Sequence, residues 1–402
     1  MRGVSTLPFL SAARARIAAN GIRGFSLRSV AQDAGTSLGS LNYRIGDKAA
    51  LIAQVIEEER VERREVHAVW LTRAAALDLG VPAVLVAVVT AYLDQAAEAR
   101  RDAVLTGCEL LLEAGLDPAG YPGIGGLLDE EDDFWIQLVT RDLGAVAGIF
   151  GRALANYCRD ELPFSIVAGH DPDYRLLRAA TIERLAAGLV GDGNGLSRHF
   201  DALVVACGTT STAAPLPVDL VRGSKKAELA QHIAGVIVDQ GVASVTHRLV
   251  AARAGVPNSS VAHYFRTRED LLQAGMGALI LEMRDELGQV GGAALQRRHG
   301  PALIRATHSI ALAAARDPAL IPFAVDMRRR RAENVRAMIG DAIGGAAGLD
   351  GGAIQAAVMV MIGGSFAVQA RDEARAMDAD MLDQLVLLRR DLAERRRATP
   401  KT

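Results

Sequence analysis

The sequence predicts an all-α protein made of two related halves. Apolar residues recur at intervals of three and four rather than two, aromatic residues make up only 4% of the chain, and strand-like runs are almost absent. The stretches "AQDAGTSLGSLNYRIGDKAAL" (31–51) and "AARAGVPNSSVAHYFRTREDL" (251–271) align without a gap at an offset of 220 residues. This internal repeat, in a chain of 402 residues, favours two halves of about 200 residues each.

Each copy of the repeat begins with a predicted helix that has apolar residues at i, i+4 and i+8 and therefore one buried face. This helix ends at Gly21 in the first copy and at Gly241 in the second, because glycine can adopt the left-handed conformation that closes a helix. Ser26 and Thr246 then offer hydroxyl N-caps for a second helix. That helix is predicted over 27–34 and 247–254.

Only three residues separate this helix from a third, which is predicted over 38–44 and 258–264. Two short helices joined by a three-residue turn with a glycine form a helix-turn-helix. A long fourth helix follows. It is capped by Asp47 in the first copy and begins with the capping box 267–270 in the second.

After Ser26 and Thr246, the residues "AGTSLGSLNYRIGDKAAL" and "AGVPNSSVAHYFRTREDL" resemble the N-terminal DNA-binding domain of the TetR family of transcriptional regulators. The resemblance covers about 45 residues of each copy. The first copy departs from the family pattern at Arg44-Ile45, where His-Phe is usual, and the second at Ala262, where an aromatic residue or Asn is usual. The resemblance implies a ligand-responsive repressor whose partner is double-stranded DNA.

The candidate DNA-binding residues lie on the third helix of each copy and at the helix starts around it, because an exposed reading helix contacts base edges while flanking groups hold phosphates. In the first copy they are Ser26, Arg28, Ser37, Leu38, Gly39, Ser40, Asn42, Tyr43, Arg44 and Lys48. In the second copy they are Thr246, Arg248, Asn258, Ser259, Ser260, His263, Tyr264 and Arg268. The caps Ser26 and Thr246 and the cations Lys48 and Arg268 are expected at phosphates.

The two reading faces differ chemically, so we predict an asymmetric operator with two unlike half-sites about one helical turn apart. The charge distribution favours contact of the repeats with a polyanion. The chain has a formal net charge of −2, but residues 1–56 carry +5 and residues 221–276 carry +3, which leaves −10 for the remainder.

Five segments are predicted along the chain. They are a helix-turn-helix domain over 1–50, a helical regulatory domain over 51–190, a linker over 191–223, a second helix-turn-helix domain over 224–270 and a second regulatory domain over 271–402. The linker is expected to contain a short helix through "DALVVAC". Helices of the regulatory domains are expected over 84–100, 103–114, 134–159 and 174–190, and over 302–316, 323–339, 353–371 and 381–396.

The family resemblance implies that the regulatory domains bind a ligand and that the last two helices of each half form a four-helix interface. The linker is long enough for the second half to fold back beside the first, so an intramolecular pseudo-dimer is preferred, with a dimer of chains as the alternative. A largely apolar small molecule is the expected effector. Its pocket could be lined by large side chains that are more often plain core residues, namely Phe134, Trp135, Tyr157, Met327, Met338, Met359, Met361 and Phe366.

The run Arg328–Arg331 is expected to be a solvated helix face, with a pocket arginine for an acidic ligand as the minority interpretation. The sequence supports no enzyme, cofactor or metal site, because its histidines and cysteines lack metal-binding spacing and no Gly-x-Ser-x-Gly motif occurs. Three cysteines without a CxxC pair, no convincing signal peptide and no run long enough to span a membrane favour the cytoplasm. A sensor or interaction scaffold that has lost DNA binding is the alternative function, and the second copy is the stronger candidate for that loss.

Overall fold

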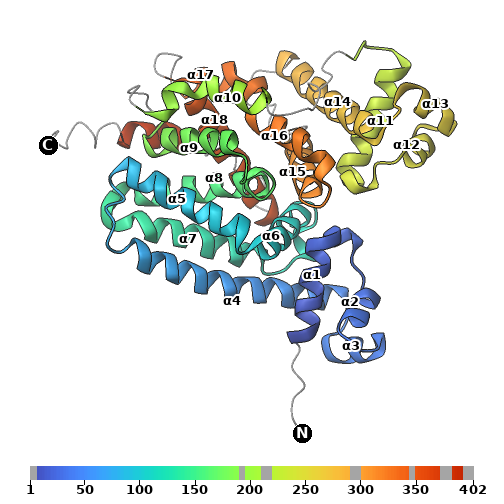
Figure 1. The fold of residues 1–402 in the computed structure, drawn as a ribbon, viewed down its shortest axis with the longest axis horizontal. Coiled ribbons are helices and arrows are strands. Elements are labelled where there is room, and N and C mark those ends of the chain that lie inside the picture. Colours follow the sequence, from blue (N-terminus) through green and yellow to red (C-terminus); the bar gives the residue numbers. More distant parts are fainter. Residues whose placement is uncertain are drawn as a thin grey trace, which may run out of the picture. The chain divides into compact units, whose positions relative to one another are not determined.

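The computed structural model describes residues 7–189, 195–209, 220–289, 300–343, 349–371 and 383–392, and every regular element in these ranges is a helix (Figure 1). The all-α prediction is therefore confirmed. The chain groups into two compact units. Unit 1 consists of Met1–Leu203 together with Ile339–Thr402, and unit 2 consists of Val204–Met338.

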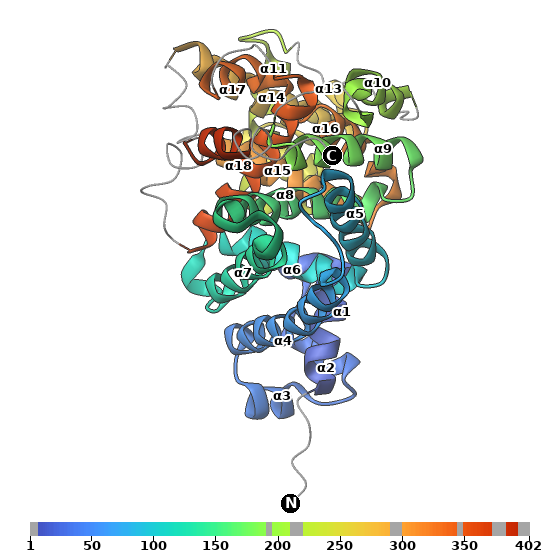
Figure 2. The same cartoon turned by 90° about the vertical axis from the view of Figure 1, so that its left-hand side faces the viewer.

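Unit 1 contains the helices of the first half and the last helices of the second. They are α1 (Leu7–Gly24), α2 (Leu27–Asp33), α3 (Leu38–Ile45), α4 (Lys48–Ala74), α5 (Pro82–Glu98), α6 (Arg101–Ala114), α7 (Ile124–Leu143), α8 (Ala147–Ala168), α9 (Pro172–Ala186) and α18 (Gly351–Arg371). Residues 383–392 are also helical. In Figures 1 and 2, α1, α2 and α3 lie together at one end of this unit, and α4 leads from them into the remaining helices.

Unit 2 contains the second copy of the repeat and the helices that follow it. They are α11 (Lys225–Gln240), α12 (His247–Ala254), α13 (Asn258–Tyr264), α14 (Arg268–Gln289), α15 (Gly300–Ala314) and α16 (Ile321–Arg329). The boundaries between the units fall within α10 (Phe200–Thr209) and α17 (Arg336–Ala342). The predicted short helix in the linker is α10, while 191–194 and 210–219 of that linker lie outside the described residues.

Two long helices predicted from the sequence are each broken. The helix expected over 134–159 is divided into α7 and α8 by Gly144, which has a φ of +58°. The helix expected over 323–339 is divided into α16 and α17, and Ala332 between them has a φ of +77°. An apolar pattern that continues on both sides of a short break keeps the period of one helix, so periodicity alone misses such breaks. Of the helix predicted over 381–396, residues 381–382 and 393–396 lie outside the described residues.

Helix α18 is the element that brings the two halves of the chain together. Its residues from Gly351 to Ala367 are all buried, so it has no solvent-facing side over that length. It packs along α8 and α9 and also contacts α6 and α7 within unit 1 (Figures 1 and 2). Among the described helices it is the one long and apolar enough to cross a membrane, and its burial inside unit 1 is that of a core helix.

The crossing of α18 over α8 depends on a glycine. A Cβ atom added to Gly363 would lie 1.8 Å from the backbone oxygen of Asn156, so the two helices approach closely at this point. Polar contacts flank the crossing, because Thr181 Oγ1 donates to Gln355 Oε1 over 3.2 Å and Arg371 pairs with Asp132 over 3.1 Å. Helix α18, from the second half of the sequence, is thus fixed to helices of the first half by packing and by polar groups.

Replacing Gly363 by Ala is expected to destabilise the protein by about 2 to 3 kcal/mol, because the new methyl group has no space beside a backbone atom. The matched control is Gly148→Ala in α8, where the nearest atom to an added Cβ is the flexible Arg152 guanidinium at 3.9 Å. Thermal unfolding should show a fall of several degrees in Tm for Gly363→Ala and no fall for Gly148→Ala. Equal Tm values for the two variants would contradict this close approach.

Candidate nucleic-acid interface

The first copy of the repeat folds as predicted from its caps and glycines. Gly21 has a φ of +72° and interrupts the helical conformation of α1. The Ser26 hydroxyl accepts from the Ser29 backbone N–H over 3.2 Å and caps α2, while Gly35 at a φ of +64° lies in the turn before α3. On α3 the side chains of Leu41 and Ile45 are buried, which places the opposite side of the helix at the surface.

The second copy repeats this geometry. Thr246 caps α12 by accepting from the Leu249 backbone N–H over 3.2 Å, and Gly255 ends the helix at a φ of +65°. Val261 and Phe265 take the buried positions of Leu41 and Ile45. Residue by residue, the burial of 26–45 matches that of 246–265, although the identities of the exposed side chains differ. Both copies therefore fold in the same way and expose the same aligned positions to solvent.

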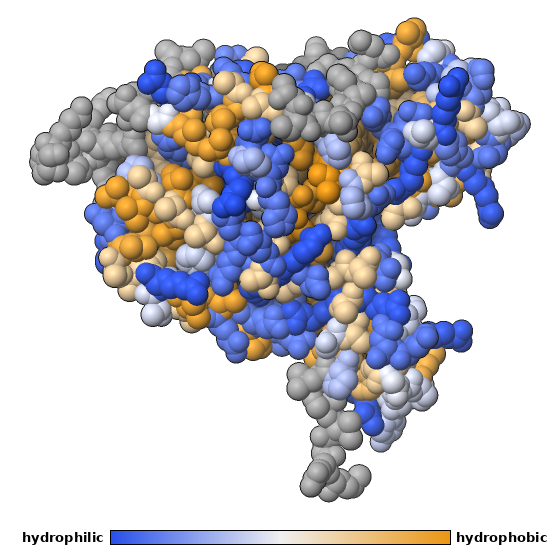
Figure 3. All heavy atoms as spheres, viewed as in Figure 1, coloured by the Kyte–Doolittle hydropathy of each residue, from blue (hydrophilic) through white to orange (hydrophobic). Residues whose placement is uncertain are grey.

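The outward faces consist mainly of the predicted reading residues. On the first copy Ser26, Arg28, Ser37, Leu38, Gly39, Asn42, Tyr43 and Arg44 are exposed, and Ser40 is half-buried. On the second copy Thr246, Arg248, Asn258, Ser259, His263 and Tyr264 are exposed, and Ser260 is half-buried. Tyr43 is 92% exposed, far more than a tyrosine with a packing role would be. Figure 3 shows mostly hydrophilic and weakly polar side chains over the end of the first domain.

Lys48 and Arg268 differ from the other candidates, because their charged groups bind inside their own domains. Lys48 Nζ donates to the backbone oxygens of Ile22 and Phe25, over 3.3 and 3.2 Å, and lies 4.5 Å from the centre of the Phe25 ring. Burial lowers the pKa of this ammonium, and the negative charge of Glu113 partly offsets that effect. A Lys48 held in this way braces the start of α4 against the end of α1, and its contact with a phosphate stays a prediction.

Arg268 occupies the corresponding place in the second copy. Its guanidinium donates to the backbone oxygen of Val242 over 3.1 Å and to Asp317 over 3.2 Å. The Arg268 side chain is still 38% exposed, so its expected phosphate contact stays a prediction. Lys48 and Arg268 have different side chains. Each nevertheless donates to the backbone oxygen of the residue that follows the glycine at the end of the first helix of its copy.

Some basic residues of the first repeat form ion pairs within the fold, so part of the positive charge of that repeat is neutralised internally. Arg14 pairs with Glu59 over 2.8 Å and with Glu62, and Arg23 pairs with Glu113 over 2.7 Å. The exposed cations nearest the reading helices are Arg28 and Arg44 in the first copy and Arg248 and Arg266 in the second. Arg266 was not predicted as a site residue. The signal that could have identified it is a basic residue directly after the reading helix, where the first copy has Gly46.

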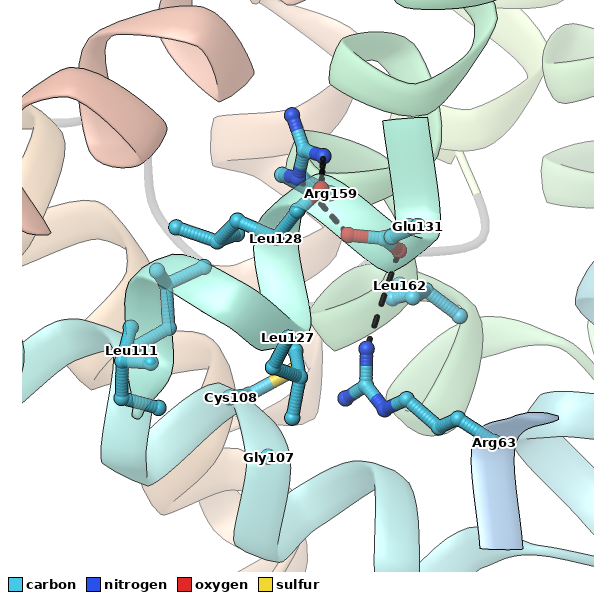
Figure 4. A pocket seen from close by; sticks show the side chains of 10 residues that line it. Arg63, Gly107, Cys108, Leu111, Leu127, Leu128, Glu131, Arg159 and Leu162 are labelled. Carbon is cyan, nitrogen blue, oxygen red and sulfur yellow. Dashed lines mark hydrogen bonds and ion pairs between the residues drawn. The ribbon is translucent and has the colours of Figure 1, made fainter. Parts of the chain in front are cut away.

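The proposed effector residues of unit 1 form a packed core. The Phe134 ring stacks on His67 with ring centres 4.0 Å apart, and Tyr92 and Trp135 contact each other edge to face with centres 4.9 Å apart. A cavity of about 20 Å³ lies beside this cluster (Figure 4). A water molecule needs about 10 to 15 Å³ of such space, so this cavity has a size suited to water rather than to an effector.

Charged groups line one side of the same cavity. Glu131 lies between Arg63 and Arg159, at 3.7 Å from the first guanidinium and 2.8 Å from the second (Figure 4). Burial raises the pKa of the Cys108 thiol, at the other side of the cavity, to about 12, which keeps it protonated. Burial, together with the positive charges of Arg63 and Arg100, lowers the pKa of His67 to about 3.

The structure of unit 2 contradicts the expectation of a solvated arginine run. Arg328 is completely buried and Asp326 is 2% exposed, so the run Arg328–Arg331 is not a solvated helix face. The helix α16 ends at Arg329, and its period places Arg328 on the inner side. Arg331 donates to the Thr307 hydroxyl of α15 over 2.9 Å. Within the described residues no group of three or more His, Cys, Asp or Glu side chains is arranged to hold a metal ion.

Lys48→Met is expected to lower the free energy of unfolding by about 1 to 3 kcal/mol, because two buried backbone oxygens lose their donor. Tyr43→Ala, at a residue 92% exposed, is expected to leave stability unchanged. Denaturant unfolding of both variants measures the difference. A Lys48→Met protein as stable as the wild type would refute the bracing role.

The lowered pKa of His67 predicts a loss of stability in acid. Below about pH 6.5 the unfolded chain binds a proton at this residue and the folded protein does not until about pH 3, so stability falls with pH by up to about 1.4 kcal/mol per unit in this window. His67→Phe keeps the ring stacked on Phe134 and removes this titration. Denaturant unfolding between pH 7 and pH 4.5 should give a flatter profile for His67→Phe than for the wild type, and the exposed His170→Phe control should keep the wild-type profile.

Comparison with known proteins identifies one of the two copies. The model of the family described as bacterial regulatory proteins, tetR family, matches residues 233–274, from within α11 to within α14. No curated protein matches the chain at a significant level. The match falls on the second copy, which its sequence makes the stronger candidate for loss of DNA binding. Residues 233–274, with α12 and α13 at their centre, are therefore similar to the helix-turn-helix domain of the tetR family of bacterial regulatory proteins.

Proposed function

We propose that this protein is a DNA-binding transcription regulator that reads an asymmetric operator, with one half-site for each copy of the repeat. The observation that carries the proposal is the matching burial of 26–45 and 246–265 combined with different exposed side chains. Two DNA-binding domains that recognise different base sequences require the same backbone fold with different exposed side chains. The first copy is then a second tetR-type domain in the same chain.

The exposed groups suggest what each half-site contains. Asn42 and Arg44 on α3 suit adenine and guanine edges, since each can form two hydrogen bonds to one base. On α13 the aligned residues are Ala262 and Tyr264, and the exposed polar groups lie instead at Asn258, Ser259 and His263. Tyr43 and Tyr264 each add an aromatic ring at the same outward face. Arg28 and Arg248 begin the two capped helices α2 and α12 and are positioned for phosphates.

We further propose that one chain forms the pseudo-dimer. Helix α18 and the helical residues 383–392 come from the end of the chain, and they pack in unit 1 against the last helices of the first half. Leu392 contacts the turn after α9, where a Cβ added to Gly188 would lie 2.7 Å from Leu392 Cβ. The surface that a TetR-like half would use for a second chain is thus covered by the same chain. This leaves self-association between chains unnecessary for a complete interface.

A small, largely apolar effector remains part of the proposal, together with a cytoplasmic location and the absence of enzyme activity. The aromatic cluster of His67, Tyr92, Phe134 and Trp135 is the apolar environment that supports such an effector. Because the adjacent cavity has only about 20 Å³, effector binding requires these side chains to separate. Such a rearrangement between α4 and α7 is a plausible source of a change in DNA affinity.

A footprint on the DNA upstream of the gene for this protein tests the proposal. Two adjacent protected regions of different sequence are expected, and the affinity should fall at least about tenfold from ~50 to ~200 mM salt, because phosphate contacts release counterions. Tyr43→Ala should weaken one region and His263→Ala the other. Operators with either half-site duplicated should bind more weakly than the natural one.

Three results would each contradict a different part of this proposal. A symmetrised operator that binds as tightly as the natural one would remove the claim of unlike half-sites. Complete absence of protection at low salt would favour the sensor or scaffold function instead. Loss of both regions in Tyr43→Ala, with no effect of His263→Ala, would show that the first copy alone reads DNA.

A further inference from the structure

The backbone at the end of the first helix in each DNA-binding domain is held by a side chain from a regulatory helix. After Gly21, the Ile22 N–H donates to Glu109 Oε2 of α6 over 3.3 Å. After Gly241, the Val242 N–H donates to Ser309 Oγ of α15 over 3.2 Å. Both glycines have a positive φ, +72° and +78°, which directs the next N–H away from the helix it follows.

The carbonyl group of the same residue is held from the other side. Ile22 O accepts from Lys48 Nζ at the start of α4, and Val242 O accepts from the Arg268 guanidinium at the start of α14. We call each set of three residues a hinge clamp, namely Glu109, Ile22 and Lys48 in the first half and Ser309, Val242 and Arg268 in the second. In each clamp, one residue of the DNA-binding domain is bound through its N–H and its C=O by two different helices.

The two clamps occupy equivalent places, although their side chains differ. Helices α6 and α15 are each followed by an Asp-Pro turn, in which Asp117 and Asp317 cap the 3₁₀ helices η1 (Pro118–Gly120) and η6 (Pro318–Leu320). Glu109 and Ser309 lie eight residues before these aspartates in both halves. An equivalent hydrogen bond has therefore been kept with a carboxylate in one half and a hydroxyl in the other.

Each clamp holds the peptide groups next to a glycine at which the DNA-binding domain can pivot. A glycine with positive φ provides no side chain that could hold the joint, so the orientation of the following helices depends on what binds the next peptide groups. In the first half the space above Gly21 is also occupied, because an added Cβ would lie 3.3 Å from both Glu109 carboxylate oxygens. A charged acceptor forms a stronger hydrogen bond than a neutral hydroxyl, so the first clamp is the stiffer of the two.

We propose that Glu109 and Ser309 are positioning residues for DNA recognition, each fixing the presentation of one reading helix through the backbone N–H at the hinge. This inference rests on the proposed function. It assigns to α6 and α15 the contact by which a movement of the regulatory helices changes the orientation of α3 and α13. Because Glu109 and Ser309 differ, the two half-sites lose occupancy to different extents when the clamps are removed.

The test compares Glu109→Met and Ser309→Ala in the full chain by footprinting, with half-sites assigned through Tyr43→Ala and His263→Ala. Glu109→Met should weaken the α3 half-site about tenfold, the factor that one hydrogen bond to a charged group contributes, and leave the α13 half-site unchanged. Ser309→Ala should weaken only the α13 half-site, by about threefold. Glu109→Gln retains an acceptor oxygen and should restore most of the affinity.

Two controls separate positioning from general stability and from the proposed function. Gly151→Ala, whose added Cβ would lie 2.5 Å from the Ile136 backbone where α7 and α8 cross, destabilises unit 1 without touching either clamp, so at a temperature where the protein stays folded it should not discriminate between the half-sites. Hydrogen exchange needs no DNA: amides of 22–33 should exchange faster in Glu109→Met, and those of 242–253 in Ser309→Ala. If the wild-type protein protects no DNA, the proposed function is wrong but the clamp is not contradicted. If amide exchange after Gly21 and Gly241 is unchanged in the variants, or if each variant weakens both half-sites equally, the clamp proposal is wrong.

Discussion

An apolar helix without a polar face must be covered on every side, and this requirement governs how the two halves of this chain combine. Helix α18 is buried over its whole length from Gly351 to Ala367, and its cover comes from α8 and α9. A helix from the end of the sequence is therefore an internal component of the unit formed by the beginning. The apolar surface of α18 is thus buried against helices of the first repeat half, within one chain.

The same helix reaches the first DNA-binding domain. Ala367 and Ala370 belong to an apolar cluster that also contains Phe9, Ile17 and Leu41 and that continues through Leu110 of α6. The position of α18 is thus coupled by direct packing to the domain that carries α3. Coupling of this kind requires one contiguous set of side chains with a defined arrangement, and the cluster provides it.

Much of the DNA-binding geometry could be predicted from the sequence, because local signals determine it. Ser26, Gly35 and Thr246 act through the backbone of their own turns, and the fixed spacing of apolar residues places Leu41 and Val261 inside. The hydrogen bonds of Lys48 and Arg268 within the fold could not be predicted, because their partners, Ile22 O and Val242 O, are distant in sequence. The burial of Arg328 and the break at Gly144 likewise depend on tertiary packing, which a helical period does not record.

The presence of two different reading helices in one chain has a genetic consequence. In a twofold-symmetric dimer, one codon change alters both reading helices at once, and a matching operator needs two simultaneous base changes. Here a codon change at Tyr43 alters a single helix, since the corresponding residue of the other copy is His263. Under the proposed function, regulator and operator could therefore diverge one half at a time, and each intermediate would keep one unaltered set of contacts.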